Sequence, residues 1–252
     1  MISRTFRIGG IHPSDNKITA DKPTVALPAP DTVVIPLAQH IGAPAVPIVK
    51  KGDKVKVGSL IAQANGFVSA PIHSSVSGTV LKIDKAINTS GYYQPAIIIG
   101  VEDDVWEDSI DRTDTIETLD EHPEITSETI VQRVKDAGIV GMGGAGFPTF
   151  IKLCPSPENK LTCVIINAVE CEPYITSDYR LIIEHADEIL IGIKLLMKAT
   201  SVSKAYIGVE DNKPEAISLL MKKTRECPEI EVVSLKQKYP QGGEKQLVDA
   251  II

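Results

Sequence analysis

One segment of the chain, residues 102–128, carries most of its charge and separates two halves of different character. It holds twelve acidic residues and a single basic one, Arg112. A stretch with so many carboxylates and few large apolar side chains cannot bury much surface, which is typical of a connector or a solvated rim. The sequence therefore predicts a first domain at residues 1–101, an acidic connector at 102–128 and a second domain at 129–252.

The overall composition is that of a folded protein. Of the 252 residues, 43% are hydrophobic and 23% are charged, with a net charge of −7 at pH 7. This acidic balance argues against a nucleic-acid partner. No apolar run is long enough for a membrane span, and the amino terminus lacks a leader pattern, so we expect a cytoplasmic protein. The four cysteines are too widely spaced for a metal site, and we expect free thiols.

The first half is predicted to be a compact all-β unit. Short runs rich in Val and Ile, separated by turn residues, lie at 32–36, 46–49, 59–63, 79–83 and 96–101. Residues 52–58 read G-D-K-V-K-V-G, and a comparable turn and strand pattern follows about twenty residues later, at 69–80. Two similar half-motifs predict a flattened barrel with internal near-symmetry.

These half-motifs resemble the barrel-sandwich domains of the biotinyl/lipoyl type. Carrier members of that family bear a lysine at the tip of the hairpin between the two halves. The corresponding tip here, residues 64–68, reads A-N-G-F-V and contains no lysine. A rigid docking module is therefore favoured over a swinging carrier.

A glycine-rich loop opens the second half, after a predicted helix at 127–137 that ends at Gly138. Residues 141–149 read G-M-G-G-A-G-F-P-T, and Lys152 follows closely. Without Cβ atoms, main-chain N–H groups can approach a phosphate or a flat ring. The spacing is not that of the dinucleotide-binding fingerprint, because a helix precedes the loop where that motif requires a strand.

Strands and helices then alternate, which predicts a mostly parallel sheet. The predicted strands are 161–168, 204–209 and 231–235, with helices at 180–200 and 214–225 between them. Asn167 lies at the carboxyl end of the first strand, where open α/β sheets bind ligands. Glu170 and Glu172 follow as an E-x-E pair, which could equally be a solvated acidic turn. Residues 242–247, G-G-E-K-Q-L, predict a second anion-binding helix start.

Three ordered motifs carry a family resemblance: G-x-G-G-A-G-F-P-T-x-x-K, then N-A-x-E-x-E-P, then G-G-E-K-Q-L. Together they resemble the flavoprotein subunit of respiratory complex I and, more closely, the amino-terminal portion of the RnfC component of the Rnf electron-transport complex. The barrel motifs fit the Rnf component specifically. The resemblance implies an α/β fold class, with a barrel-sandwich domain followed by a Rossmann-like domain that binds FMN noncovalently.

The resemblance also assigns roles to individual residues. It implies that NADH, the substrate, contacts Phe147 through its rings and Glu172 through its ribose. The complex I pattern has acidic residues where this chain has Val169 and Lys245, so contacts there are expected to differ. The residues implied to bind FMN are Gly141, Gly143, Gly144, Lys152, Asn167, Glu170, Gly243 and Glu244.

The function implied is that of a redox subunit. Hydride would pass between NADH and FMN, and electrons would leave singly to iron–sulfur clusters, with no catalytic side chain required. Full-length relatives are expected to hold two 4Fe–4S clusters, but this chain has no ligands for them. The implied partners are NAD(H), the other Rnf subunits and, through them, ferredoxin, at the cytoplasmic face of the membrane. A redox-inactive docking module is the alternative.

Overall fold

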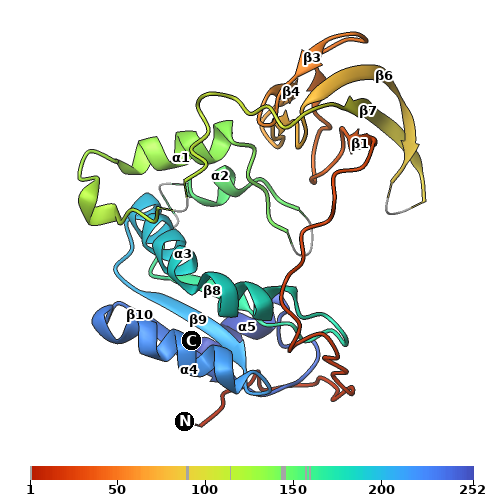
Figure 1. Cartoon of the computed structure of the whole chain (residues 1–252). Coiled ribbons are helices and arrows are strands. Elements are labelled where there is room, and N and C mark those ends of the chain that lie inside the picture. The colour runs from red at the N-terminus through yellow and green to blue at the C-terminus, as the bar shows by residue number, and fades with distance from the viewer. Residues whose placement is uncertain (1, 89–90, 114, 143–145, 157, 159) are drawn as a thin grey trace. The chain divides into compact units, whose positions relative to one another are not determined.

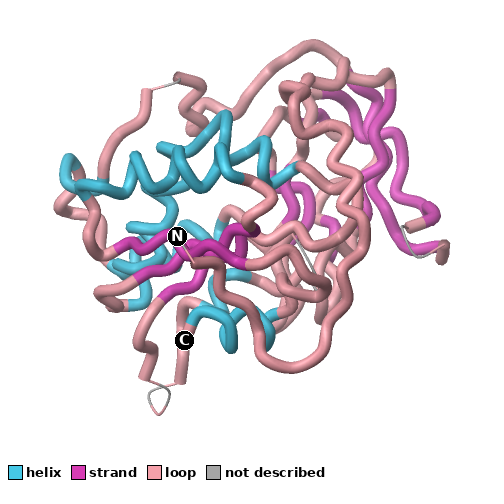
Figure 2. Tube along the Cα trace, turned by 90° about the horizontal axis from the view of Figure 1, so that it is seen from below, coloured by secondary structure: helices cyan, strands magenta, loops and turns pink. Residues whose placement is uncertain are grey.

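The computed structural model describes every residue except 1, 89–90, 114, 143–145, 157 and 159. Contacts between Cα atoms divide the chain into two compact units, whose elements are labelled in Figure 1 and coloured by type in Figure 2. The barrel unit contains residues 26–115 and 128–158. The α/β unit contains residues 1–25, 116–127 and 159–252.

The barrel unit is built from two small antiparallel sheets. One has the strand order β1-β7-β6-β3 and the other β2-β4-β5. Their apolar side chains form one core cluster, which includes the fully buried Ile61, Ile97 and Ile99. The predicted β unit is thus confirmed. Its strands are β1 (Thr32–Pro36), β2 (Val46–Pro47), β3 (Lys54–Val55), β4 (Leu60–Gln63), β5 (Ile72–His73), β6 (Gly78–Ile87) and β7 (Tyr93–Val101).

Two helices, α1 (Ser127–Asp136) and the short α2 (Thr149–Lys152), follow the acidic segment. Gly138 ends the first of them, as predicted, with a φ of +67° that favours glycine. A Cβ atom at this position would lie 2.2 Å from the carbonyl oxygen of Pro71, so only glycine fits there. The acidic segment itself is divided, with its first part in the barrel unit and residues 116–127 in the α/β unit, where η1 (Leu119–Glu121) lies.

The α/β unit contains the predicted parallel sheet, with strand order β10-β9-β8. Helix α3 starts three residues earlier than predicted, and β8 starts three residues later. Residues 161 and 162, at the start of the predicted strand, are exposed. The elements are β8 (Val164–Ala168), α3 (Ser177–Thr200), β9 (Ala205–Glu210), α4 (Pro214–Lys223), η2 (Thr224–Glu226), β10 (Ile230–Leu235) and α5 (Glu244–Ile251).

The central strand, β9, packs against helices on both of its faces. Ala205, Ile207 and Val209 join a core cluster with residues of α3 and α4. The alternate residue Tyr206 packs on the cluster that contains α5. Gly208 also lies on this second face, and a Cβ atom there would be 2.9 Å from Leu247 Cδ1. Because strand side chains alternate between faces, β9 is buried on both sides and glycine allows α5 to approach closely.

Residues 2–25 belong to the α/β unit, although the sequence grouped them with the barrel. Backbone pairing explains this: Arg4 forms a parallel bridge with Leu235, and Ile11 an antiparallel bridge with Tyr239. Further along, the N–H of Thr24 donates to Glu184 Oε1 at 3.0 Å. We call residues 2–25 the amino-terminal strap. Within the part of the chain that the structure describes, no helix has the length and apolarity to cross a membrane.

The close packing of α5 on β9 predicts opposite effects at two glycines. Gly208→Ala should lower the free energy of unfolding by about 1 kcal/mol or more, because the surrounding side chains are buried. Gly192, in α3, has nothing within 4 Å of a built Cβ atom, so Gly192→Ala should raise the free energy of unfolding by about 0.5–1 kcal/mol. Urea denaturation measures both. Equal effects at the two positions would contradict this packing.

The contact between the strap and α3 predicts a pH dependence of stability. Hydrogen bonds from Arg180 and Thr24 lower the pKa of Glu184 from 4.5 to about 2. A lowered carboxyl pKa stabilises the fold above pH 4.5, and this contribution is lost as the pH falls towards 2. In the Glu184→Gln variant, the melting temperature should therefore fall less than in the wild type as the pH is lowered from 4.5 towards 2. Thermal unfolding between these pH values measures this. Glu226→Gln, at an exposed position, is the control. If the two variants lose stability equally as the pH falls, the result would argue against the contact.

Candidate functional site

The carboxyl ends of β8, β9 and β10 lie at the same edge of the parallel sheet, and the loops that follow them carry most of the predicted site residues of this unit. Asn167, the penultimate residue of β8, is exposed and connects two of these loops. Its Nδ2 donates to the carbonyl of Gly242 at 2.9 Å, and its Oδ1 accepts from the N–H of Val169 at 3.3 Å. Asn167 thus links the loop after β8 to the glycines after β10.

Glu170 is 2% exposed and caps helix α3. Its Oε1 accepts from the N–H of Asp178 at 2.6 Å, and its Oε2 accepts from the N–H of Tyr179 at 3.3 Å. These N–H groups belong to the first turn of α3, where unpaired donors and the helix dipole favour a carboxylate. Burial raises the pKa of Glu170, although these N–H groups and the charge of Lys213 act in the opposite direction. This capping explains the early start of α3.

Glu172 differs from Glu170 because its side chain is exposed. Between them, Cys171 is buried, and burial and then the negative charges of Glu172 and Glu210 raise the pKa of its thiol. A thiol with a raised pKa is a poor nucleophile at neutral pH. Tyr174, further along the same loop, has a φ of +71° and is 60% exposed.

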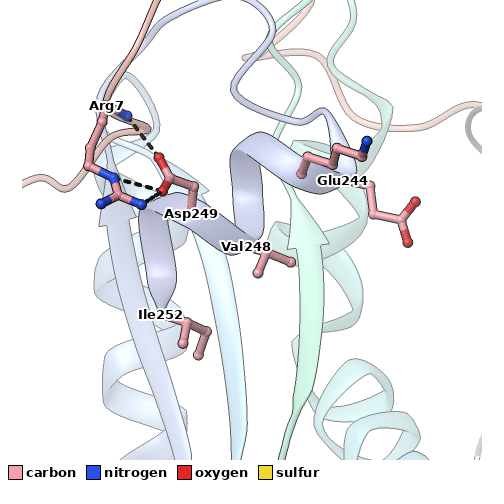
Figure 3. A pocket seen from close by; sticks show the side chains of 6 residues that line it. Arg7, Glu244, Val248, Asp249 and Ile252 are labelled. Atoms are coloured by element: carbon pink, nitrogen blue, oxygen red, sulfur yellow. Dashed lines mark hydrogen bonds and ion pairs between the residues drawn. The ribbon is translucent and has the colours of Figure 1, made fainter. Parts of the chain in front are cut away.

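The second glycine pair lies just before α5. Gly243 is the N-cap of this helix, and a Cβ atom there would lie 2.4 Å from Gln246 Oε1. A Cβ atom at Gly242 would lie 3.2 Å from the carbonyl oxygen of Val169. Glu244 is the exposed first residue of α5. It lines a pocket of about 880 Å³ together with Arg7, Lys245, Val248, Asp249 and Ile252 (Figure 3).

The first glycine-rich loop belongs to the barrel unit. Gly143 and Gly144 lie outside the described residues. The loop is closed by a bridge between Val140 and Pro148, and the N–H of Gly141 donates to the carbonyl of Phe147 at 2.9 Å. A Cβ atom at Gly141 would lie 3.3 Å from Lys152 Nζ. The structure thus brings Gly141, Phe147 and Lys152 together, and the ammonium group of Lys152 lies beside the backbone of Gly141.

Two buried charged residues at the carboxyl edge of the sheet were not anticipated. Glu210 is fully buried and Lys213 is 4% exposed, with 3.1 Å between Lys213 Nζ and Glu210 Oε2. Burial raises the pKa of Glu210, and the charge of Lys213 opposes this. Among the described residues, Glu210 Oε1 and Gln241 Nε2 have no hydrogen-bond partner. A carboxylate directly after the apolar run of β9 was the sequence signal that could have revealed this pair. No metal-binding cluster occurs among the residues with described positions.

Comparison with known proteins supports the family resemblance. The model of the RnfC barrel sandwich hybrid domain matches residues 5–104, and that of the Nuo51 FMN-binding domain matches residues 134–252. The RnfC-type protein of the proton-translocating ferredoxin:NAD+ oxidoreductase complex of Clostridium ljungdahlii is 45% identical over 250 residues, which are 98% of this chain and 53% of that protein. The chain is similar to the amino-terminal portion of RnfC-type proteins. The predicted resemblance and the predicted order of its two folds are confirmed.

Two further members of the RnfC family have similar coverage. The corresponding protein of the Na+-translocating ferredoxin:NAD+ oxidoreductase complex of Acetobacterium woodii is 45% identical over 98% of this chain and 55% of its own length. That of an ion-translocating oxidoreductase complex of Rhodobacter capsulatus is 41% identical over 96% of this chain and 46% of its own length. The chain therefore spans about half the length of these relatives.

The two glutamates of the E-x-E loop are expected to differ in their effect on stability. Glu170→Ala leaves N–H groups of the first turn of α3 without their acceptor, so it should lower the free energy of unfolding by about 0.5–2 kcal/mol. Glu172→Ala removes an exposed side chain and should change it by less than about 0.5 kcal/mol. Chemical denaturation of both variants measures the difference. A loss of stability for Glu172→Ala as large as that for Glu170→Ala would contradict the capping role.

Proposed function

We propose that this chain binds FMN noncovalently and exchanges hydride with NADH, as part of the RnfC component of an ion-translocating ferredoxin:NAD+ oxidoreductase. The observation that carries this proposal is the position of Lys152 Nζ, 3.3 Å from where a Cβ atom of Gly141 would be. A cation beside a glycine is suited to a phosphate group, because no side chain at the glycine keeps the phosphate oxygens away from the positive charge. The match to an FMN-binding domain over residues 134–252 supports the same ligand.

The other proposed FMN contacts follow from the family resemblance and from the chemistry of each residue. Gly143 and Gly144 would present backbone to the flavin. Asn167 uses its amide to hold Gly242, so its contribution would include fixing the second glycine turn. Gly243 and Glu244, at the start of α5, would face the cofactor. Glu170 already accepts hydrogen bonds from α3, so it would contact the ligand only with its remaining acceptor capacity.

NADH would use Phe147 and Glu172. The exposed carboxylate of Glu172 can accept hydrogen bonds from ribose hydroxyls, and it would repel the additional phosphate of NADPH. Phe147 can stack on a flat ring of the dinucleotide, worth about 0.5–1.5 kcal/mol beyond the buried area. These contacts would orient the substrate, and no side chain is required as acid, base or nucleophile. Bound FMN would supply the exchange between a hydride and single electrons.

The remaining partners in this proposal follow from the relatives. Their names describe subunits of complexes that act on ferredoxin and NAD+. We propose that this chain passes electrons towards ferredoxin through iron–sulfur clusters of the complex and is held at the cytoplasmic face of the membrane by other subunits. In the barrel unit, Phe67 is 76% exposed at the hairpin tip that lacks a lysine, which favours docking over a carrier role.

FMN titration of the purified chain tests this function. Quenching of flavin fluorescence is expected for the wild type. Lys152→Met should raise the Kd for FMN about tenfold or more, since a hydrogen bond to a charged group contributes about 1.5–3 kcal/mol. Lys51→Met, which removes an exposed lysine of the same unit, is the matched control and should bind as the wild type does. If the wild type does not bind FMN at high micromolar concentrations, the docking module becomes the better explanation.

A further inference from the structure

A second feature of the α/β unit bears on the E-x-E loop and is independent of the glycine turns. The ammonium group of Lys17, in the amino-terminal strap, donates to three backbone carbonyls of residues 170–175. Lys17 Nζ lies 2.8 Å from the oxygen of Glu170, 2.9 Å from that of Glu172 and 2.6 Å from that of Ile175. One lysine uses all three of its donors on a single loop.

Two neighbours of Lys17 in the strap hold the same loop. The carbonyl of Asp15 accepts from the N–H of Tyr174 at 2.8 Å, at the residue whose φ is positive. The hydroxyl oxygens of Thr19 and Thr176 are 2.7 Å apart. The strap therefore contacts the loop at its start, middle and end. We call residues 15–19 the clamp.

The clamp determines which parts of the loop face solvent. Because three carbonyls are directed at Lys17, the backbone acceptors are occupied on that side, while the side chains of Glu172 and Tyr174 remain exposed. Tyr174 is held in a backbone conformation that a residue other than glycine rarely adopts. Such a conformation persists only where the surroundings impose it, and this is common at ligand-binding sites.

Opposing effects act on the charge of Lys17. Partial burial lowers the pKa of Lys17, and the positive charge of Lys213 adds to this, whereas Glu170 and Glu210 oppose it. The ammonium group nevertheless donates to three carbonyl oxygens at once, which requires a side chain with three donors. A neutral replacement of similar length would leave the three carbonyls without this common donor.

We propose that Lys17 is a positioning residue for the dinucleotide: it fixes the 170–176 loop so that Glu172 is held ready to accept hydrogen bonds from the ribose of NADH. This inference rests on the proposed function. Lys17 touches the backbone of the loop and not the substrate. Its contribution is preorganisation, because a loop that is ordered before binding does not lose conformational entropy when the ligand arrives.

Lys17→Met tests the inference through two measurements on the whole chain. Hydrogen exchange at the amides of residues 171, 172 and 174–176 should become faster than in the wild type. The Kd for NADH, measured on the FMN-loaded protein, should rise about tenfold, because ordering even one residue on binding costs about that factor. Lys22→Met removes a lysine from the same strap whose exposed side chain has no polar contact among the described residues, and it should change neither measurement.

Thr19→Val provides a second variant of nearly unchanged shape, which loses only the hydroxyl contact to Thr176 and should shift both measurements in the same direction by less. A merely structural role for Lys17 would lower the melting temperature and weaken FMN and NADH equally, which would overturn the inference. Unchanged NADH affinity in both variants would also overturn it, provided that the wild type binds NADH. If the wild type itself fails to bind NADH, the proposed function fails, whatever the exchange rates of the loop are.

Discussion

The parallel pairing of β8, β9 and β10 is the constraint on which the candidate site of the α/β unit depends. In register, Ala168 pairs with Val209 and Ser234 pairs with Val209 from the other side, so the three strands end at the same edge. Parallel strands require crossover connections, and the helices α3 and α4 supply them. The loops after the strands are therefore neighbours, although they are far apart in the sequence. Polar residues at these strand ends meet only because of this pairing.

The sheet changes character from its middle to its carboxyl edge. Within the strands, Ile207 and Val209 are almost fully buried among apolar side chains. At the edge, Glu210 and Lys213 are equally buried but charged, and Glu170 is buried beneath the start of α3. Buried charges destabilise a fold unless they are paired or hydrogen-bonded. Lys213 pairs with one carboxylate oxygen of Glu210, and backbone N–H groups of α3 donate to Glu170. The amino-terminal strap also contributes at this edge, because Lys17 donates hydrogen bonds to three backbone carbonyl oxygens of the loop after β8.

The local patterns of the sequence predicted most of the secondary structure. Short runs rich in Val and Ile between turn residues indicated most of the barrel strands to within a few residues, and Gly138 indicated the end of α1. The prediction failed at the start of α3, because the cap is Glu170, a residue separated from the helix by a loop. It also could not reveal that residues 2–25 pack on the α/β unit, since their irregular backbone has no periodicity to interpret.

By itself, the sequence determined the fold class and the glycine turns. These follow from composition and spacing, because side-chain periodicity and backbone freedom are local properties. Its three ordered motifs also carried the family resemblance. Only the tertiary structure decided what each carboxylate does. In the structure, Glu170 accepts a hydrogen bond from the first turn of α3, Glu172 is exposed, and Glu210 is buried in an ion pair with Lys213. The reason is that burial and hydrogen-bond partners come from segments distant in the chain, and these determine whether a charged group binds a ligand or supports the fold.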